Sequence, residues 1–159
     1  MNIKKISIIG SYRRNIDIMT NIKEKLNSFD VSVVLPISGN VIDRNEKFVR
    51  LEENNTSLDD FAIQNDAIKA ILESDAIYVV CHNGYIGNTT CYEIGWIASN
   101  KKPIAFSEMP IDLPICIDDK YIMDEVVFFN KLKNDKLVPI NIDCCTCNMK
   151  GVGKKCKKE

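Results

Sequence analysis

The apolar run from Ala76 to Cys81 constrains the fold of this chain more strongly than any other segment. It is rich in β-branched and aromatic residues, and the turn-forming residues Asn83 and Gly84 follow it. This combination is typical of a strand that is buried on both faces of a parallel sheet. Because parallel neighbours are joined by a crossover, the segment after the run should return as a helix. We therefore expect an α/β fold.

The rest of the chain alternates between strand-like and helix-like patterns. Apolar residues from Ile16 to Phe29 recur at spacings of three and four, which marks one face of an amphipathic helix. A capping-box pattern at Ser57 predicts another helix from Leu58 to about Ser74. The alternation predicts a doubly wound, Rossmann- or flavodoxin-like fold, with a mainly parallel sheet of about five strands flanked by helices. Strands are expected at residues 4–9, 31–35, 76–81, 104–106 and near 113–117, and further helices from residue 88 or 89 and over 123–132.

Length and charge restrict the classes of function. A chain of 159 residues suits one domain, which we place at residues 1–135, with a Cys- and Lys-rich tail at 136–159. Because 21 basic residues nearly balance 22 acidic ones, neither a nucleic acid polymer nor a membrane is favoured as partner, and we expect a small-molecule ligand. No stretch approaches the roughly 18 apolar residues that span a bilayer, and the first residues enter a strand rather than a signal peptide. We expect a cytoplasmic protein.

Four of the seven cysteines lie in the tail. Their spacing allows a zinc site, but the tail lacks paired CxxC knuckles and a nearby histidine. The favoured interpretation is a flexible extension whose thiols stay reduced in the cytosol. We therefore expect no bound metal.

Glu93 is the only acidic or basic residue, His82 aside, in the 25 residues from Ala76 to Asn100. If a helix begins near Asn88 or Thr89, Glu93 lies in its second turn, with polar neighbours on one side and apolar ones on the other. One interpretation is a surface glutamate, which helices tolerate well. The other is a partly buried catalytic carboxylate, which acts as a nucleophile or as a base.

Two polar loops follow predicted strands and should meet at the carboxyl edge of the sheet. Gly84 and Gly87 let a ligand approach main-chain N–H groups near the positive end of the next helix, which suits phosphate or sugar oxygens. The loop after the first strand adds a serine, an aromatic ring and an arginine. The expected ligand-binding residues are Gly10, Ser11, Tyr12, Arg13, Asn83, Gly84, Gly87, Asn88, Thr89 and Thr90.

Three further features bear on this site. Asp66 is expected to point toward it from the flank of a helix stripe made of Leu58, Phe61, Ile68 and Leu72. Residues 36–55 form a long connection that is predicted to cover the site. Asp75, just before the buried strand, is interpreted as structural, because such residues usually bond to backbone.

These residues resemble the nucleoside 2-deoxyribosyltransferase superfamily, which includes transferases and deoxynucleoside 5′-monophosphate N-glycosidases. The resemblance extends over about Lys4 to Phe106 and is strongest from Ser74 through Gly84–Thr90 to Ile97. In that family the glutamate that matches Glu93 is the nucleophile. Asn65-Asp66 resembles the pair that supplies an acidic residue, although its spacing to Asp75 differs by about one residue. Gly10-Ser11-Tyr12-Arg13 resembles the Gly-Ser-Ile-Arg loop that holds a 5′-phosphate, with Tyr12 in place of an aliphatic residue.

The resemblance implies cleavage of the N-glycosidic bond of a 2′-deoxynucleoside or its 5′-monophosphate. Glu93 would attack the anomeric carbon, Asp66 would protonate the departing base, and another base or water would then take the sugar. No cofactor or metal is needed. The family completes its sites with residues of a neighbouring subunit, so a homodimer or higher homo-oligomer is also implied.

Two alternatives stay open. A phosphoribohydrolase of the cytokinin-activating type has a glycine-rich motif with Thr and Glu that resembles Gly84 to Glu93, but it begins with a double glycine that this chain lacks. A non-catalytic nucleotide sensor could use the same loops, with Glu93 merely contacting ribose. The sequence separates neither hydrolase from transferase nor one base from another.

Overall fold

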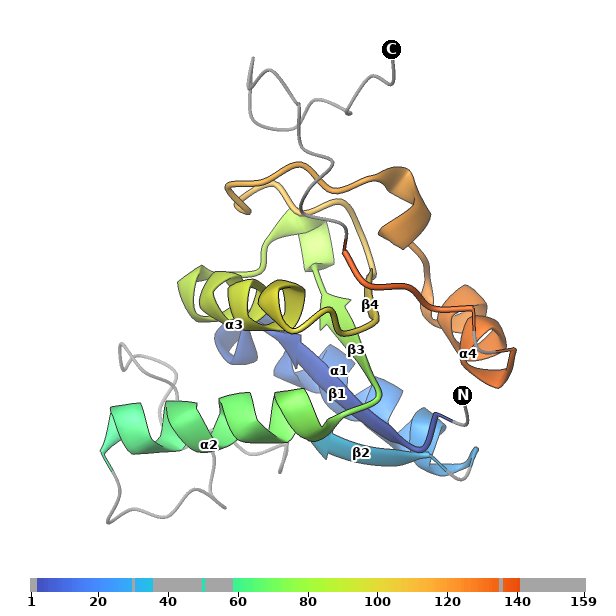
Figure 1. Cartoon of the computed structure of the whole chain (residues 1–159), viewed down its shortest axis with the longest axis horizontal. Helices are drawn as coiled ribbons and strands as arrows, with labels where there is room; N and C mark the ends of the chain where they lie inside the picture. The colour runs from blue at the N-terminus through green and yellow to red at the C-terminus, as the bar shows by residue number, and fades with distance from the viewer. Residues whose placement is uncertain (1–2, 30, 36–49, 51–58, 135, 141–159) are drawn as a thin grey trace.

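The structure is a computed structural model that describes residues 3–29, 31–35, 50, 59–134 and 136–140. Figure 1 shows strands in the centre with helices on both sides. The elements are β1 (Lys5–Gly10), α1 (Tyr12–Asn27), β2 (Ser32–Leu35), α2 (Asp60–Glu73), β3 (Ala76–Val80), the 3-10 turn η1 (His82–Gly84), α3 (Asn88–Ser99), β4 (Ile104–Phe106), the 3-10 turn η2 (Asp119–Tyr121) and α4 (Glu125–Lys133).

The predicted α/β fold is confirmed. The described strands form one all-parallel sheet in the order β2-β1-β3-β4. The chain moves outward from β1 in one direction to β2 and then returns to place β3 on the other side of β1. This reversal makes the boundary between β1 and β3 the switch point of the sheet, and Gly10 and Val80 are register partners at its carboxyl edge.

The alternation of side chains along β3 divides the core into two layers. Ile77 and Val79 pack with apolar residues of α2 and α3, whereas Tyr78 and Val80 pack with residues of α1 and α4. Figure 1 shows the same arrangement, with α2 and α3 in front of the sheet and α1 behind it. All five residues of β3 are buried, which explains why this run was recognisable in the sequence.

Several expected element boundaries are wrong. Residues 113–117 contain no strand, so the described sheet has four strands rather than about five. Helix α1 begins at Tyr12, one turn earlier than Ile16, and α2 begins after an Asp59 cap. Phe61, expected in the buried stripe of α2, is 74% exposed, because Ile63, Ile68 and Ile71 face the sheet instead. The expected Leu58 contact, the covering connection 36–55 (apart from residue 50) and the tail from residue 141 lie outside the described residues.

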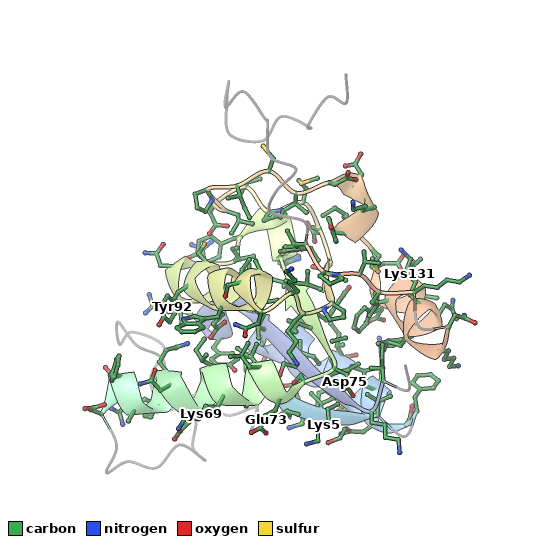
Figure 2. The ribbon with its side chains drawn as sticks, viewed as in Figure 1. Lys5, Lys69, Glu73, Asp75, Tyr92 and Lys131 are labelled. Carbon is green, nitrogen blue, oxygen red and sulfur yellow. The ribbon has the colours of Figure 1, made fainter. Side chains whose placement is uncertain are left out.

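The structural interpretation of Asp75 is confirmed. Its Oδ2 accepts hydrogen bonds from the backbone N–H groups of Lys4 and Lys5, at 2.8 and 2.9 Å. Asp75 therefore ties the start of β3 to the start of β1, far from the carboxyl edge (Figure 2). Within the described residues, no helix has the length and apolar character required to cross a membrane.

Gly10 is required where β1 and β3 approach each other. Its φ is +154°, and a Cβ placed there would lie 2.7 Å from the carbonyl oxygen of Val80. We expect Gly10→Ala to lower the free energy of unfolding by about 2 kcal/mol, measured by urea denaturation. Gly95→Ala is the control: a Cβ there meets nothing within 4 Å, so this helical substitution should be neutral or slightly stabilising. Equal effects of both changes would contradict the steric argument.

Candidate functional site

Glu93 lies on the inner face of α3. The buried residues of this helix recur with helical spacing, and Glu93 is among them with only 8% of its surface exposed. It follows Thr90 by one turn and precedes Ile97 by one turn. The sequence therefore directs a carboxylate toward the protein interior, at a position where an aliphatic residue would pack without cost.

The surroundings of the Glu93 carboxylate are nearly uncharged. Its Oε1 accepts a hydrogen bond from Nε2 of Gln64 on α2, at 3.0 Å, and no described lysine or arginine forms an ion pair with it. Burial raises the pKa of Glu93 to about 7, although the hydrogen bond from Gln64 acts in the opposite direction. Near neutral pH both the protonated and the ionised form of Glu93 are therefore populated, and a pKa shifted in this way is frequent at functional sites.

Tyr12, the first residue of α1, interacts with the Glu93 carboxylate. Burial raises the pKa of its phenol well above the ordinary value, and the charge of Glu93 raises this pKa further. The phenol and the carboxylate are therefore electrostatic neighbours, and the phenol stays protonated at neutral pH. The predicted meeting of the loop after β1 with Glu93 thus occurs at Tyr12.

The two arginines after Tyr12 are exposed at the same end of α1. The guanidinium carbon of Arg14 lies 3.8 Å from the ring centroid of Tyr85, which comes from the loop after β3. This cation–π contact joins the first turn of α1 to the loop after β3. Ser11 is the N-cap residue of α1, but its side chain makes no capping hydrogen bond.

The glycine loop is arranged differently from the sequence expectation. The N–H groups of Ile86 and Gly87 donate to the carboxylate of Asp112, at 3.0 and 2.8 Å, rather than facing a ligand site unpaired. Gly84 is buried, and its carbonyl accepts from the N–H of Ile111. Asp112 therefore fixes the loop that precedes α3, using the geometry that was expected to bind an anion.

The first turn of α3 keeps donors at its N-terminus. The first hydrogen bond of the helix runs from the N–H of Cys91 to the carbonyl of Gly87. The N–H groups of Asn88, Thr89 and Thr90 therefore take no part in the helical hydrogen bonds. Asn88 and Thr89 are exposed, whereas Thr90 is 2% exposed. Among the described residues, nothing forms a hydrogen bond with the Thr90 hydroxyl. Asn83 is exposed in a left-handed conformation, with φ of 54°.

Asp66 is not brought to Glu93. Its side chain is 60% exposed and pairs with Lys69, whose Nζ lies 2.9 Å from Oδ1. Figure 2 shows Lys69 and Glu73 on the side of α2 that faces away from α3. The expectation that Asp66 points toward the site is wrong because each helical residue turns by about 100°, which places residue 64 toward α3 and residue 66 outward.

Comparison of this chain with protein-family models, with curated proteins and with solved structures gives no match. The resemblance to nucleoside 2-deoxyribosyltransferases therefore rests on the motifs quoted above.

Sequence reasoning missed two residues that shape this site. Gln64 shares a helix face with Ile68 and Ile71, at spacings of four and three, so its inward position was visible in the pattern. Asp112 follows β4 in a segment without regular structure. No local pattern indicates its contact with Ile86 and Gly87, which lie 26 and 25 positions earlier in the sequence.

Proposed function

We propose that this protein cleaves the N-glycosidic bond of a 2′-deoxynucleoside or its 5′-monophosphate, with Glu93 as the nucleophile. The observation that carries the proposal is the position of Glu93. Its carboxylate is 8% exposed, forms no ion pair with a described lysine or arginine, and belongs to the helix that follows β3 at the switch point of the parallel sheet. A buried carboxylate without a cation destabilises a fold, so its presence indicates a role in chemistry. The proposal includes nucleotide metabolism as the setting, and a homodimer or higher homo-oligomer as the assembly.

The surrounding groups support binding of a sugar. The buried hydroxyl of Thr90 lies one turn before Glu93 on the same helix face, and suits a hydrogen bond to a sugar hydroxyl. Tyr12 supplies a protonated phenol and an aromatic ring next to the carboxylate. Arg13 is exposed in the first turn of α1, near the positive end of that helix, and a guanidinium there suits a 5′-phosphate.

The proposed reaction has two displacements. In the first, a bond forms between a carboxylate oxygen of Glu93 and C1′ of the sugar while the bond from C1′ to the base nitrogen breaks. The base leaves with the electron pair and takes up a proton. In the second, a ring nitrogen of another base or a water oxygen attacks C1′, loses a proton and releases Glu93 as carboxylate. Since Asp66 faces outward and burial raises the pKa of the Tyr12 phenol, we assign the proton of the first step to solvent, which also takes up the proton lost in the second step.

Chromatography of the purified protein with each deoxynucleoside and each 5′-monophosphate tests the function, with and without a second free base. Release of base in the absence of acceptor would indicate an N-glycosidase, whereas a new nucleoside formed only with acceptor would indicate a transferase. Ribonucleoside 5′-monophosphates are included because their cleavage would favour the phosphoribohydrolase alternative. Binding without any product would contradict the enzymatic proposal and favour the nucleotide sensor.

The pH dependence of the reaction should reflect Glu93. The nucleophile must be ionised, and its pKa is about 7, so kcat/KM should fall as the pH drops below about 7 and approach a tenfold loss per pH unit. The measurement is a profile of kcat/KM from pH 5 to about 9, with substrate concentrations that extend from below KM to above it at each pH. A profile that stays flat down to pH 5 would contradict the assignment of Glu93 as the ionised nucleophile.

Arg13→Ala tests whether the substrate carries a 5′-phosphate. Loss of one charged contact to phosphate is worth about 1.5 to 3 kcal/mol, so KM for a monophosphate should rise about tenfold or more, with nucleoside use unchanged. Lys23→Ala, three turns later on α1, is the matched control and should leave both KM values unchanged. If Arg13→Ala affected monophosphates and nucleosides equally, the phosphate assignment would fail.

A further inference from the structure

Gln64 is the described side chain that makes a hydrogen bond with the Glu93 carboxylate. It belongs to α2, which packs beside α3 in front of the sheet, and its side chain is partly buried. The bond runs from Nε2 of Gln64 to Oε1 of Glu93 at 3.0 Å. Within the described residues, Oε2 of Glu93 accepts no hydrogen bond. The two oxygens of the carboxylate are therefore not equivalent.

We propose that Gln64 is a positioning residue, which holds Oε1 of Glu93 so that Oε2 is the oxygen that attacks the sugar. This inference rests on the proposed function. An oxygen that accepts a strong hydrogen bond is a weaker nucleophile, so a single donor both selects the attacking oxygen and limits rotation of the carboxylate. Alignment of this kind lowers the barrier because the reacting atoms must meet in a narrow range of geometry.

A neutral donor suits this role better than a cation. A lysine or arginine at position 64 would lower the pKa of Glu93 strongly and reduce its nucleophilicity, whereas an apolar residue would leave the carboxylate protonated at neutral pH. The amide lies between these extremes: it stabilises the ionised form without adding a charge. Gln64 therefore keeps Glu93 ionisable in a buried setting.

Apart from Tyr12, the charged groups named here on the neighbouring elements interact with partners other than Glu93. Tyr12 interacts with it from α1 and is a protonated phenol. On α2, Asp60 pairs with Arg50, and Asp66 pairs with Lys69. In the loop after β3, His82 is exposed, and its Nδ1 lies 3.7 Å from Glu108. On α3, Glu93 is the only acidic or basic residue. Gln64 is therefore the described group whose removal should change the titration of Glu93 most directly.

Gln64→Met tests the inference, because it removes the donor and keeps an unbranched side chain of similar length. The acidic limb of the pH profile should move upward by about one pH unit, and kcat on the plateau should fall about tenfold. Gln64→Glu provides a second variant, in which a carboxylate faces Glu93 and should move the limb further upward. Glu73→Gln, on the outer face of α2, is the control and should change neither value.

A titration that needs no turnover separates this inference from the proposed function. In protein labelled with [¹³C]carboxyl glutamate, the Glu93 signal is assigned by its loss in Glu93→Gln, and its NMR titration is compared between wild type and Gln64→Met. A higher pKa in Gln64→Met, together with the slower plateau, supports the positioning role. An unchanged titration and an unchanged profile in an active enzyme would overturn it while leaving the proposed function intact. If wild type cleaves no substrate, the proposed function fails, and the catalytic role of Gln64 falls with it whatever the titration shows.

Discussion

Glu93→Gln should abolish cleavage of the glycosidic bond while substrate binding survives. The amide has nearly the same size and shape as the carboxylate, and its oxygen can still accept the hydrogen bond from Gln64. It lacks the negative charge needed to attack C1′, so kcat should fall by about three orders of magnitude or more, as is usual when a nucleophile is removed. The measurement is single-turnover release of base, with ligand affinity determined separately by calorimetry.

The comparison of binding with turnover distinguishes an enzyme from a sensor. An enzyme should keep an affinity within a few-fold of wild type and lose turnover, whereas a sensor should bind normally and show no turnover in either form. Tyr92→Phe, at the exposed neighbouring position, is a matched control that should retain activity. Full activity of Glu93→Gln would eliminate Glu93 as the nucleophile.

The same substitution should stabilise the folded protein above neutral pH. The pKa of Glu93 is about 7 in the folded state against an ordinary value of 4.5, so between these values the folded state holds a proton that the unfolded state has lost. The free energy of unfolding therefore falls as the pH rises through this window. Above about pH 7 the ionised carboxylate lowers it by about 3 kcal/mol relative to a neutral isostere.

Urea denaturation of wild type and Glu93→Gln at pH 4 and pH 8 measures this effect. The variant should exceed wild type by about 3 kcal/mol at pH 8 and match it closely at pH 4. Glu24→Gln, exposed on α1, serves as the control and should have little effect at either pH. A variant less stable than wild type at pH 8 would mean that the buried carboxylate is not a source of strain, and would remove the main support for its catalytic role.

The fold was predictable because its central strand carries an unusually clear signal. β3 is buried on both faces, so its apolar run needed no tertiary information to be recognised. The edge of the sheet was less predictable. Residues 113–117 are apolar enough for a strand, but they lie in irregular backbone near the glycine loop, where Asp112 caps that loop and Ile111 packs against Gly84. Such long-range pairing leaves no periodicity in the sequence.

The candidate site was predicted in part for a similar reason. The sequence left Glu93 open between a surface glutamate and a partly buried carboxylate, and the structure shows the buried position. Asp66 was assigned from a dipeptide match and a position at the edge of a stripe, where a one-residue offset rotates the side chain by about 100°. The buried stripe passes through Ile63, Ile68 and Ile71, and Gln64 lies beside it, one turn before Ile68, where it reaches Glu93.

The most direct test of the central claim is to trap the glycosyl-enzyme intermediate. A 2′-fluoro-arabinosyl nucleotide slows the second displacement, because the electron-withdrawing fluorine destabilises the oxocarbenium-like transition state. Mass spectrometry of the incubated protein should show one added fluorinated sugar 5-phosphate, carried by the peptide that contains Glu93 and absent in Glu93→Gln. Attachment to a different residue, or an adduct that persists in Glu93→Gln, would contradict the assignment of Glu93 as the nucleophile.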